Sequence, residues 1–419
     1  MKCRFCKNEL KIEFVDLTNS PASNSYLSLG QLNEPEVFYP LKIFVCSECK
    51  LVQVDEYKKS DDIFDNDYAY FSSYSTSWLA HAKDYVESMT KRLSLDENSK
   101  VTEIASNDGY LLQFFQEKNI PCIGIEPTSN TAAVAREKGI DVIGDFFGSA
   151  LAKTLDKSDL ILGKNVLAHV PDINDFVKGL KTALKPHGTV TMEFPHLLNL
   201  IKENQFDTIY HEHFSYLSFY TVQKIFINQG LKLYDVEKYP THGGSIRIFA
   251  THQDNSIETS PNVENMLKEE ESFGLFDIEI YKGFQEKTDK VKNDLLDFLV
   301  QAKKENKTVV GYGAAAKGNT LLNYAGVKND LIDFVVDKSP YKQGKYLPAS
   351  HIPILDEEVL RHSKPAYVLI LPWNLKDEVV DQLSYIKQWG GRFVVAVPSL
   401  NVLWKYWLPE QLDSLVIIL

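Results

Sequence analysis

The sequence predicts an α/β protein in which two doubly wound parallel sheets follow a small cysteine-rich module. Short apolar segments alternate with helical segments between residues 101 and 194, and the alternation restarts between residues 308 and 398. Such alternation is typical of a parallel sheet with helices on both faces. The module is indicated by two C-x-x-C pairs within the first fifty residues.

The composition is that of a soluble globular protein, because 44% of the 419 residues are apolar and 24% are charged. These fractions exclude wholesale disorder, a collagen-like chain and a membrane-spanning bundle. The 57 acidic residues outnumber the 45 basic ones, and no long basic block offers nucleic acid a binding patch. The sequence contains no signal-peptide core and no apolar run near the roughly 18 residues of a membrane span. We therefore expect a cytoplasmic protein without nucleic-acid or membrane partners.

The two cysteine pairs, Cys3 with Cys6 and Cys46 with Cys49, have the spacing of a structural zinc site. Two thiolates on a tight turn supply half of a tetrahedral shell, so two such turns fill all four positions and leave none for catalysis. Redox pairs or disulfides are the alternative, and a reducing compartment argues against disulfides. We expect a structural Zn²⁺ in a domain at residues 1–65.

The first α/β unit is expected within residues 66–260, beginning with a helix near Thr76. Its strands are expected at residues 101–105, 122–127, 159–165 and 188–194. Its other helices are expected to begin at Tyr110, to run from Thr131 to Lys138, and to run from Asp172 to Leu184.

Residues 261–305 are charged and helically periodic, so they are expected to form connecting helices. The second α/β unit is expected at residues 306–419. Its strands are expected at residues 308–313, 331–337, 367–372 and 392–398, and its helices at residues 315–324 and 376–389.

A turn of small and polar residues marks the first candidate binding site. In doubly wound sheets, ligands bind beyond the carboxyl ends of the strands, where the strand order reverses. Glu103 ends a strand there, and Gly109 lets the backbone approach a ligand because it has no Cβ. Glu126 follows Glu103 by 23 residues, where an acid accepts hydrogen bonds from ribose hydroxyls.

This turn lacks the G-x-G-x-x-G pattern of dinucleotide sites, so it suits an adenosyl group without a pyrophosphate, as in S-adenosylmethionine. Asp145 and Phe146 are placed to contact an adenine edge and face. An ordinary tight turn is the alternative. The residues predicted to bind the cofactor are Glu103, Ser106, Asn107, Asp108, Gly109, Glu126, Pro127, Asp145, Phe146 and Asn165.

Histidines concentrate after the first alternation of strands and helices. His169 follows a strand end, and Tyr210, Glu212 and His213 lie together in QFDTIYHEHFSYLSFY. An imidazole flanked by a carboxylate and phenols can serve as a general base near neutral pH. Metal ligation by the His-x-His pair and ordinary core packing are the alternatives. The substrate contacts predicted around them are Tyr68, Tyr70, His242, Gly243 and Arg247.

In order along the chain, these motifs resemble the S-adenosylmethionine-dependent C-methyltransferases of nucleotide-linked deoxysugars. The similar segments are CRFC and CSEC, YAYFSSYSTSW, EIASNDGYLLQFF, GIEP, NVLAHVPD, QFDTIYHEHFSYLS, THGGSIRIF and GYGAAAKGNTLLNY. The combination of YHEHFSYLS with SNDG is highly specific, and the resemblance covers nearly the whole chain. It implies a class I methyltransferase core between a zinc domain and a C-terminal Rossmann-like domain that binds nucleotide sugar.

The resemblance also implies the reaction. The family methylates the carbon beside the ketone of a nucleoside-diphosphate 4-keto sugar, at C3 in its best-known members. The family's base matches His213, while Tyr210, Glu212 and His169 match residues that line the sugar site, and the early tyrosine matches Tyr70 or Tyr68. The base forms an enolate that attacks the sulfonium methyl, and Tyr70 or His169 stabilises the oxyanion.

The C-terminal segment GYGAAAKGN, residues 311–319, predicts a strand, a glycine turn and a helix whose free backbone N–H groups face an anion. Gly313, Lys317 and Asn319 are the predicted substrate contacts there, and a purely structural turn is the alternative. Alternatives for the whole protein are a sugar O-methyltransferase of glycan precursor biosynthesis, a non-catalytic zinc-containing scaffold and, less favoured, an NAD-dependent enzyme. We expect a monomer.

Overall fold

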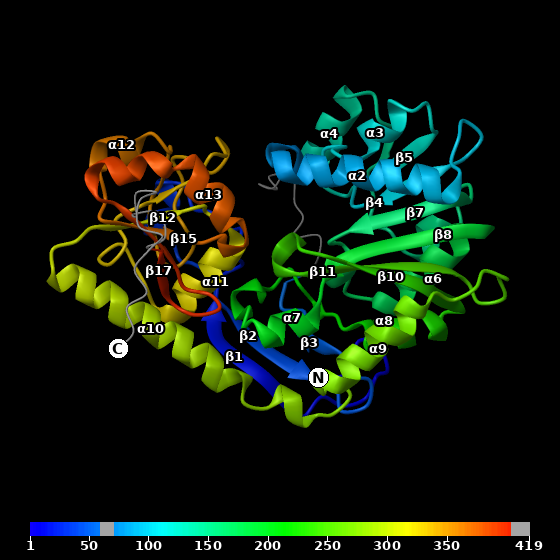
Figure 1. The fold of residues 1–419 in the computed structure, drawn as a ribbon, viewed down its shortest axis with the longest axis horizontal. Coiled ribbons are helices and arrows are strands. Elements are labelled where there is room, and N and C mark those ends of the chain that lie inside the picture. The colour runs from blue at the N-terminus through cyan, green and yellow to red at the C-terminus, as the bar shows by residue number, and fades with distance from the viewer. Residues whose placement is uncertain (59–70, 404–419) are drawn as a thin grey trace, which may run out of the picture. The chain divides into compact units, whose positions relative to one another are not determined.

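The structure, a computed structural model, describes residues 1–58 and 71–403 and divides the chain into two compact units (Figure 1). Unit 1 comprises Met1–Leu17, Pro40–Lys202 and His211–Gln285, and unit 2 comprises Thr18–Tyr39, Glu203–Tyr210 and Glu286–Leu419. The units interleave along the sequence, whereas the division expected at residues 65, 260 and 305 is linear. Within the described ranges, no helix has the length and apolar character needed to cross a membrane.

Unit 1 contains a seven-stranded sheet with the order β10-β11-β8-β7-β4-β5-β6. The strands β8, β7, β4, β5 and β6 are parallel to one another, and β11 is antiparallel to both β8 and β10. The order reverses between β4 and β7, which is where such sheets bind ligands. The strands are β4 (Val101–Ile104), β5 (Cys122–Ile125), β6 (Val142–Ile143), β7 (Ser158–Lys164), β8 (Leu184–Pro195), β10 (Leu231–Tyr239) and β11 (Ser245–His252).

Helices cover both faces of this sheet (Figure 1). Leu160 and Leu162 of β7 pack in one apolar cluster with Val86, whereas Ile161 packs in another with Val177. Successive strand side chains point to opposite faces, so burial of both faces requires a continuous apolar strand. The helices are α2 (Thr76–Leu93), α3 (Leu112–Gln116), α4 (Ser129–Glu137), α5 (Ser149–Ala152), α6 (Ile173–Ala183), α7 (Leu197–Lys202), α8 (Phe219–Asn228) and α9 (Pro261–Phe273).

Side-chain caps fix where the main helices of unit 1 begin. The Ser75 hydroxyl accepts the N–H of Trp78 at the start of α2, and the Asp172 carboxylate accepts the N–H of Asp175 at the start of α6. Each cap satisfies one of the free N–H groups of a helix N-terminus. The helix expected from Tyr110 is the short α3, which ends at Gln116. Three residues later the chain reaches Asn119, whose backbone is left-handed at φ 55°.

A second sheet has the order β1-β2-β3-β9 and joins two distant functional segments. Strand β3 follows the second cysteine pair, and β9 follows the histidine segment. In antiparallel register, Val52 pairs with Tyr216 and Gln53 pairs with Ser215. The strands are β1 (Ile12–Ser20), β2 (Tyr39–Val45), β3 (Val52–Val54) and β9 (Ser215–Tyr216).

Unit 2 contains a six-stranded sheet with the order β14-β13-β12-β15-β16-β17, parallel except for β17. Its strand order reverses between β12 and β15, as in a Rossmann-like fold. Its strands are β12 (Val309–Tyr312), β13 (Val335–Val336), β14 (Ile354–Leu355), β15 (Tyr367–Ile370), β16 (Arg392–Val395) and β17 (Asn401–Leu403). Its helices are α10 (Phe284–Lys304), α11 (Ala316–Ala325), α12 (Val359–Ser363) and α13 (Lys376–Gln382). The first two residues of α10 belong to unit 1.

Two elements of unit 2 differ from the sequence prediction. The strand expected over residues 331–337 is reduced to β13, because Leu331 and Ile332 turn back to the carbonyl of Lys328. The helix expected over residues 376–389 ends at Gln382 and continues as a 3₁₀ helix, Ser384–Trp389. The tighter turn has a period of three residues, which keeps Leu383 and Ile386 both in the core.

Candidate active site

A cavity of about 510 Å³ lies in unit 1 at the carboxyl ends of β4, β5 and β7. This is the position that the strand order favours for a ligand, and the volume suits a molecule of nucleoside size. Of the residues predicted to bind the cofactor, those in its wall are Asn107, Glu126, Pro127, Asp145, Phe146 and Asn165.

The Glu126 carboxylate organises the turn at the end of β4. Its oxygens accept the N–H of Asn107 at 2.8 Å and the N–H of Thr128 at 2.9 Å. Burial raises the pKa of Glu126 above its ordinary value, and the Thr128 and Asn107 hydrogen bonds oppose that shift. The Asn107 side chain in turn accepts the N–H of Ser72 at 2.9 Å. The serine-rich stretch before α2 is thereby attached to the turn.

Glu103, Ser106, Asp108 and Gly109 are buried behind the cavity wall. Gly109 has φ +74°, and a Cβ there would collide with the side chain of Ile140. A left-handed turn packed this closely against its neighbours requires glycine at this position. Burial raises the pKa of Glu103 well above its ordinary value, with Lys164 acting against that shift.

Asp145 and Phe146 form one end of the cavity. The Asp145 carboxylate accepts the N–H of Phe146 at 2.7 Å, which fixes the turn. The Phe146 ring is 40% exposed, so it offers a free face to a planar ligand. Phe147 and Phe176, which also line the cavity, pack edge to face with ring centroids 5.4 Å apart.

Sequence reasoning missed the polar and aromatic floor of the cavity, which contains Trp78, Tyr110 and Lys164. Trp78 stacks on Tyr110 with ring centroids 6.1 Å apart, and the Lys164 ammonium lies 5.2 Å from the Trp78 ring. Burial lowers the pKa of Lys164 to about 8, although Glu193 opposes the shift. The only available signal for Lys164 was its place at the end of a buried strand, where a lysine is unusual.

A buried charge cluster lies next to this floor, centred on Glu193 of β8. Its carboxylate contacts the Lys164 ammonium at 2.9 Å, the Arg247 guanidinium at 2.8 Å and the His81 ring at 2.7 Å. Arg247 is 1% exposed, and it also donates to the Tyr239 hydroxyl at 2.5 Å. The prediction that Arg247 contacts substrate is therefore corrected: its guanidinium is used inside the core.

His169 and His213 lie together at the edge of the cavity. Their ring centroids are 4.5 Å apart with an edge-to-face geometry, and His169 lines the cavity. Tyr216 of β9 lies on the other side of His213, with ring centroids 6.1 Å apart. Glu212 is buried, whereas Tyr210 belongs to unit 2. Tyr68 and Tyr70 lie outside the described residues.

The protonation state of His169 follows from its hydrogen bond. Its Nδ1 lies 2.8 Å from the carbonyl oxygen of Glu212, and a carbonyl only accepts, so Nδ1 carries a proton. Burial lowers the pKa of His169 to about 4. The ring is then neutral near pH 7, with a bare Nε2 that accepts and does not donate. This tautomer argues against the expectation that His169 stabilises an oxyanion.

The depressed pKa of His169 predicts a pH dependence of stability. The folded pKa of about 4 lies below the ordinary value near 6.5, so the contribution of the neutral ring is present above pH 6.5 and is lost as the pH falls toward 4. When the pH falls from 7 to 5, the free energy of unfolding of the wild type should therefore decrease by about 1–2 kcal/mol more than that of His169→Gln. Denaturant titrations at both pH values measure this difference, and equal losses would contradict it.

His242 and Gly243 lie close to the cavity in the turn before β11. The Asn165 amide donates to Nε2 of His242 at 2.7 Å, and the His242 ring packs edge to face on Trp78 at 5.0 Å. Asn165 and His242 both have left-handed backbones, with φ values of 55° and 54°. Such backbones cost about 1–3 kcal/mol each in residues other than glycine and cluster at functional sites.

In unit 2, Lys317 and Gly313 lie at the glycine turn between β12 and α11. The Lys317 ammonium donates to the Asn374 side chain at 2.7 Å and lies 4.6 Å from the Trp373 ring. Burial raises the pKa of the nearby Asp207 to about 6, opposed by Lys317 and by the N–H of Trp373. Asn319 is 1% exposed and donates to the Ser23 carbonyl at 2.6 Å. The structure therefore places Asn319, a predicted substrate contact, in a buried position beside the early segment of the chain.

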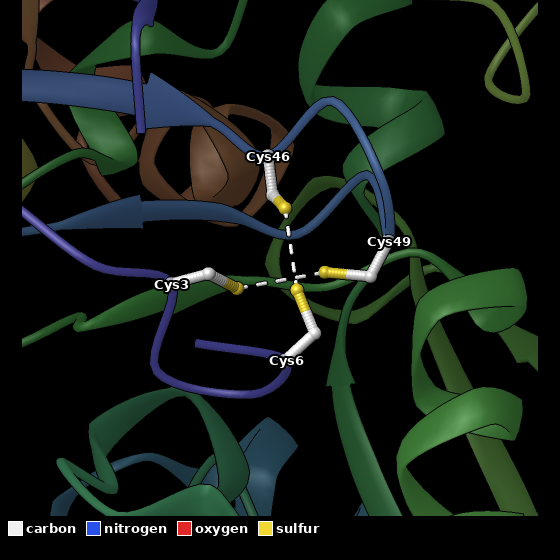
Figure 2. Close-up of side chains that lie close together, drawn as sticks. All are labelled: Cys3, Cys6, Cys46 and Cys49. Carbon is white, nitrogen blue, oxygen red and sulfur yellow. Dashed lines mark hydrogen bonds between the residues drawn. The ribbon is translucent and has the colours of Figure 1, made fainter. Parts of the chain in front are cut away.

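The four cysteines of the N-terminal module converge (Figure 2). Their sulfurs all lie within 4.8 Å of one another, and Cys3, Cys46 and Cys49 are buried. The separations from Cys3 to Cys49 and from Cys6 to Cys46 are 3.5 Å, too long for a disulfide of about 2.05 Å. Such separations fit a tetrahedral Zn²⁺ with sulfur ligands at about 2.3 Å. The Cys3–Cys49 contact lowers the pKa of the Cys3 thiol and raises that of the Cys49 thiol.

Three family models match consecutive parts of the chain. Residues 3–64 match the family described as "Putative zinc binding domain", residues 78–236 match "Methyltransferase domain", and residues 240–398 match "C-methyltransferase C-terminal domain". The C-methyltransferase NovU of Streptomyces niveus is 34% identical over 406 residues, which are 96% of each chain. The chain belongs to this C-methyltransferase family.

Two solved methyltransferase-like matches each cover less than half of this chain. Magnesium protoporphyrin IX methyltransferase of Synechocystis PCC 6803 is 14% identical and has a TM-score of 0.34, covering 42% of this chain and 83% of its own. The PH0226 protein of Pyrococcus horikoshii is 16% identical and has a TM-score of 0.36, covering 44% of this chain and 95% of its own.

The family assignment confirms that the protein is an S-adenosylmethionine-dependent methyltransferase with a zinc-binding domain. The C-methyltransferase relative favours transfer to carbon over the O-methyl alternative, and the scaffold alternative is wrong. The cavity also fits the cofactor: the buried Oδ1 of Asn165 in its wall has no hydrogen-bond partner among the described residues, so it is available to a donor such as the cofactor's ammonium group.

Proposed function

We propose that this C-methyltransferase transfers the methyl group to a ring carbon, C3, next to the ketone of a nucleoside-diphosphate 4-keto-deoxysugar. His213 is the base that removes the proton from that carbon. The observation that carries this proposal is the position of His213, whose ring packs against His169 in the wall of the cavity. The homology to a C-methyltransferase supports the carbon acceptor.

A base is needed because a ring C–H is inert until a neighbouring ketone acidifies it. Abstraction of that proton gives an enolate whose carbon is the nucleophile. His213 receives the proton on an imidazole nitrogen, while the neutral His169 beside it adds no positive charge that would lower the basicity of His213.

The cavity wall supplies the contacts for the methyl donor. In this proposal Glu126 accepts hydrogen bonds from the ribose hydroxyls, Asp145 contacts the adenine edge, and Phe146 packs on the adenine face. The bound S-adenosylmethionine supplies an electrophilic methyl group on a sulfonium. Trp78 and Lys164 line the floor of the same cavity.

Unit 2 is proposed to bind the diphosphate of the sugar nucleotide at the N-terminus of α11. The free N–H groups of this ten-residue helix and the Lys317 ammonium favour an anion. The preceding turn is held in shape, because the Tyr26 hydroxyl at 2.6 Å and the Lys342 ammonium at 2.8 Å both donate to the carbonyl of Ala314.

The proposal is tested by proton exchange in deuterated water. With a nucleoside-diphosphate 4-keto-deoxysugar and no methyl donor, the wild-type protein should exchange the proton beside the ketone. His213→Asn should slow the exchange about 10²–10⁴-fold, the usual contribution of a general base. Mass spectrometry measures the deuterium gained by the recovered sugar nucleotide.

The exposed His362→Asn is the matched control and should exchange at the wild-type rate. Calorimetry with S-adenosylhomocysteine checks that His213→Asn is folded and retains its cofactor site. Undiminished exchange in His213→Asn would refute the assigned base. Absence of exchange with every 4-keto sugar nucleotide would refute the substrate class.

A further inference from the structure

Arg4 lies inside the first cysteine turn, between Cys3 and Cys6, but its side chain extends away from the sulfurs. Its Nη1 donates to the carbonyl of Pro171 at 2.7 Å, and its Nη2 donates to the carbonyl of Val54 at 2.6 Å. The guanidinium also lies 5.3 Å from the centroid of the Phe214 ring. All of these residues belong to unit 1.

The other end of this connection reaches a metal ligand through Gln53. This residue is completely buried, its amide nitrogen donates to the Cys3 sulfur at 3.3 Å, and its amide oxygen accepts the N–H of Arg4 at 2.8 Å. Asn174 of α6 holds the turn from another side, since its amide donates to the carbonyl of Phe5 at 2.9 Å. The backbone of Arg4 is therefore fixed when the cysteine turn is fixed.

The groups that Arg4 contacts belong to the candidate active site. Pro171 lies in the cavity wall, two residues after His169, and Phe214 directly follows His213. The N–H of Val54 donates to the carbonyl of Phe214 at 3.2 Å, so Arg4 touches both sides of this strand pairing. A single side chain thereby connects the zinc domain with the cavity wall and with the histidine segment.

We propose that Arg4 is a positioning residue that couples metal occupancy of the four-cysteine site to cofactor affinity. A metal ion fixes the turn that carries Arg4, and Arg4 then holds the loop around Pro171 in the form that binds the cofactor. Coupling between two binding equilibria is reciprocal, so the bound cofactor must also strengthen retention of the metal. The proposal concerns the methyl donor alone and does not depend on the sugar substrate.

The test compares zinc-loaded wild type, Arg4→Ala and Arg4→Lys without any sugar. Because the four sulfurs remain, Arg4→Ala should keep one zinc per chain by elemental analysis, and its affinity for S-adenosylhomocysteine by calorimetry should fall about tenfold. In Arg4→Lys, the ammonium group can reach one of the two carbonyls at most, so the affinity for S-adenosylhomocysteine should fall by less than in Arg4→Ala. Lys7→Ala is the matched control, because Lys7 lies in the same turn and its exposed side chain donates to the Arg4 carbonyl, while its backbone N–H, which the substitution keeps, donates to the Cys3 carbonyl.

A second measurement follows zinc release to a chelator that forms a coloured complex. S-adenosylhomocysteine should slow this release in the wild type and in Lys7→Ala, but not in Arg4→Ala. If Arg4→Ala does not fold, Arg4→Lys is judged on the same two measurements. Unchanged cofactor affinity in a folded, zinc-loaded Arg4 variant, or equal protection of zinc by S-adenosylhomocysteine in all variants, would overturn the proposal.

Discussion

Removal of the metal from the four-cysteine site is expected to unfold the N-terminal module and to lower the melting temperature of the protein by more than about 10 °C. Structural zinc sites contribute their binding free energy to folding, and its apparent value is about 10–16 kcal/mol in zinc-finger peptides. Each lost kcal/mol lowers the melting temperature of a domain of 150–250 residues by about 2–4 °C. A part of the metal's contribution is therefore sufficient for the expected change.

The loss should not stay local, because the cysteines belong to the core of unit 1. Cys3, Cys46 and Cys49 pack in the same apolar cluster as Phe194 of β8 and Phe226 of α8. Strand β3, which follows the second cysteine pair, also pairs with β9. An uncoordinated cysteine turn therefore weakens the packing of the methyltransferase sheet itself.

The measurement is thermal unfolding of zinc-loaded protein, chelator-treated protein and Cys49→Ser. Cys122→Ser is the matched control, since Cys122 lies in β5, outside the metal site, and should melt within a few degrees of the wild type. Metal-free protein that melts at the wild-type temperature would show that the site contributes nothing to folding.

Glu193→Gln is expected to destabilise unit 1 by about 3–5 kcal/mol, the usual cost of removing one partner from a buried ion pair. Glu193 is the shared anion of Lys164 and Arg247, whose side chains, like that of Glu193, are 2% exposed. The amide keeps the shape of the carboxylate but removes the negative charge that contacts both buried cations, and Arg247 keeps only its longer contact with Glu237 at 3.6 Å. Lost packing cannot explain the result, because the substitution is isosteric.

The pKa of Glu193 adds a pH signature to this prediction. Burial alone raises that pKa, but Lys164, His81 and Arg247 more than offset burial, so the pKa lies well below its ordinary value. The stabilisation is then present above the ordinary carboxylate pKa near 4.3 and is lost as the pH falls below it. The difference between wild type and Glu193→Gln should therefore shrink in acid.

Denaturant titration of both proteins at neutral and acidic pH measures these differences. Glu269→Gln is the control, because the Glu269 side chain is 42% exposed and pairs with Lys238 of β10, a strand of the same sheet. An exposed pair of that kind contributes about 0–1 kcal/mol. Equal losses for the two substitutions would contradict the role assigned to the buried cluster.

The fold was predictable because its signals are local. Alternation of apolar strands and helices placed β4, β5, β7 and β8 close to their observed bounds, and caps such as Ser75 and Asp172 mark helix starts in the sequence itself. The strand predicted to begin at Leu331 was placed too early. An apolar stretch does not reveal that its first residues form a turn, in which the N–H groups of Leu331 and Ile332 donate to the carbonyl of Lys328. The domain division expected from the sequence was linear because no local pattern shows that Thr18–Tyr39 and Glu203–Tyr210 group with the C-terminal part of the chain.

The site was predictable where chemistry is written in a motif, and not where it depends on register. Glu126 and Asp145 follow recognisable turns and lie in the cavity wall, and the role proposed for His213 came from the resemblance to a family. Arg247 was misassigned because its partner, Glu193, lies 54 residues away on the adjacent strand β8. Which residues face each other across two strands follows from the pairing, and no local pattern contains that information.

The interleaved path of the chain determines the order in which its parts can mature during synthesis. Ser23 accepts the amide of Asn319, and Tyr26 donates to the carbonyl of Ala314, over separations of 296 and 288 residues. At about 5–20 residues per second, the early stretch waits on the order of 15–60 s for those partners to leave the ribosome. Chimeras between relatives should therefore exchange Thr18–Tyr39 and Glu203–Tyr210 together with the C-terminal half, because a single crossover splits unit 2 between two parents.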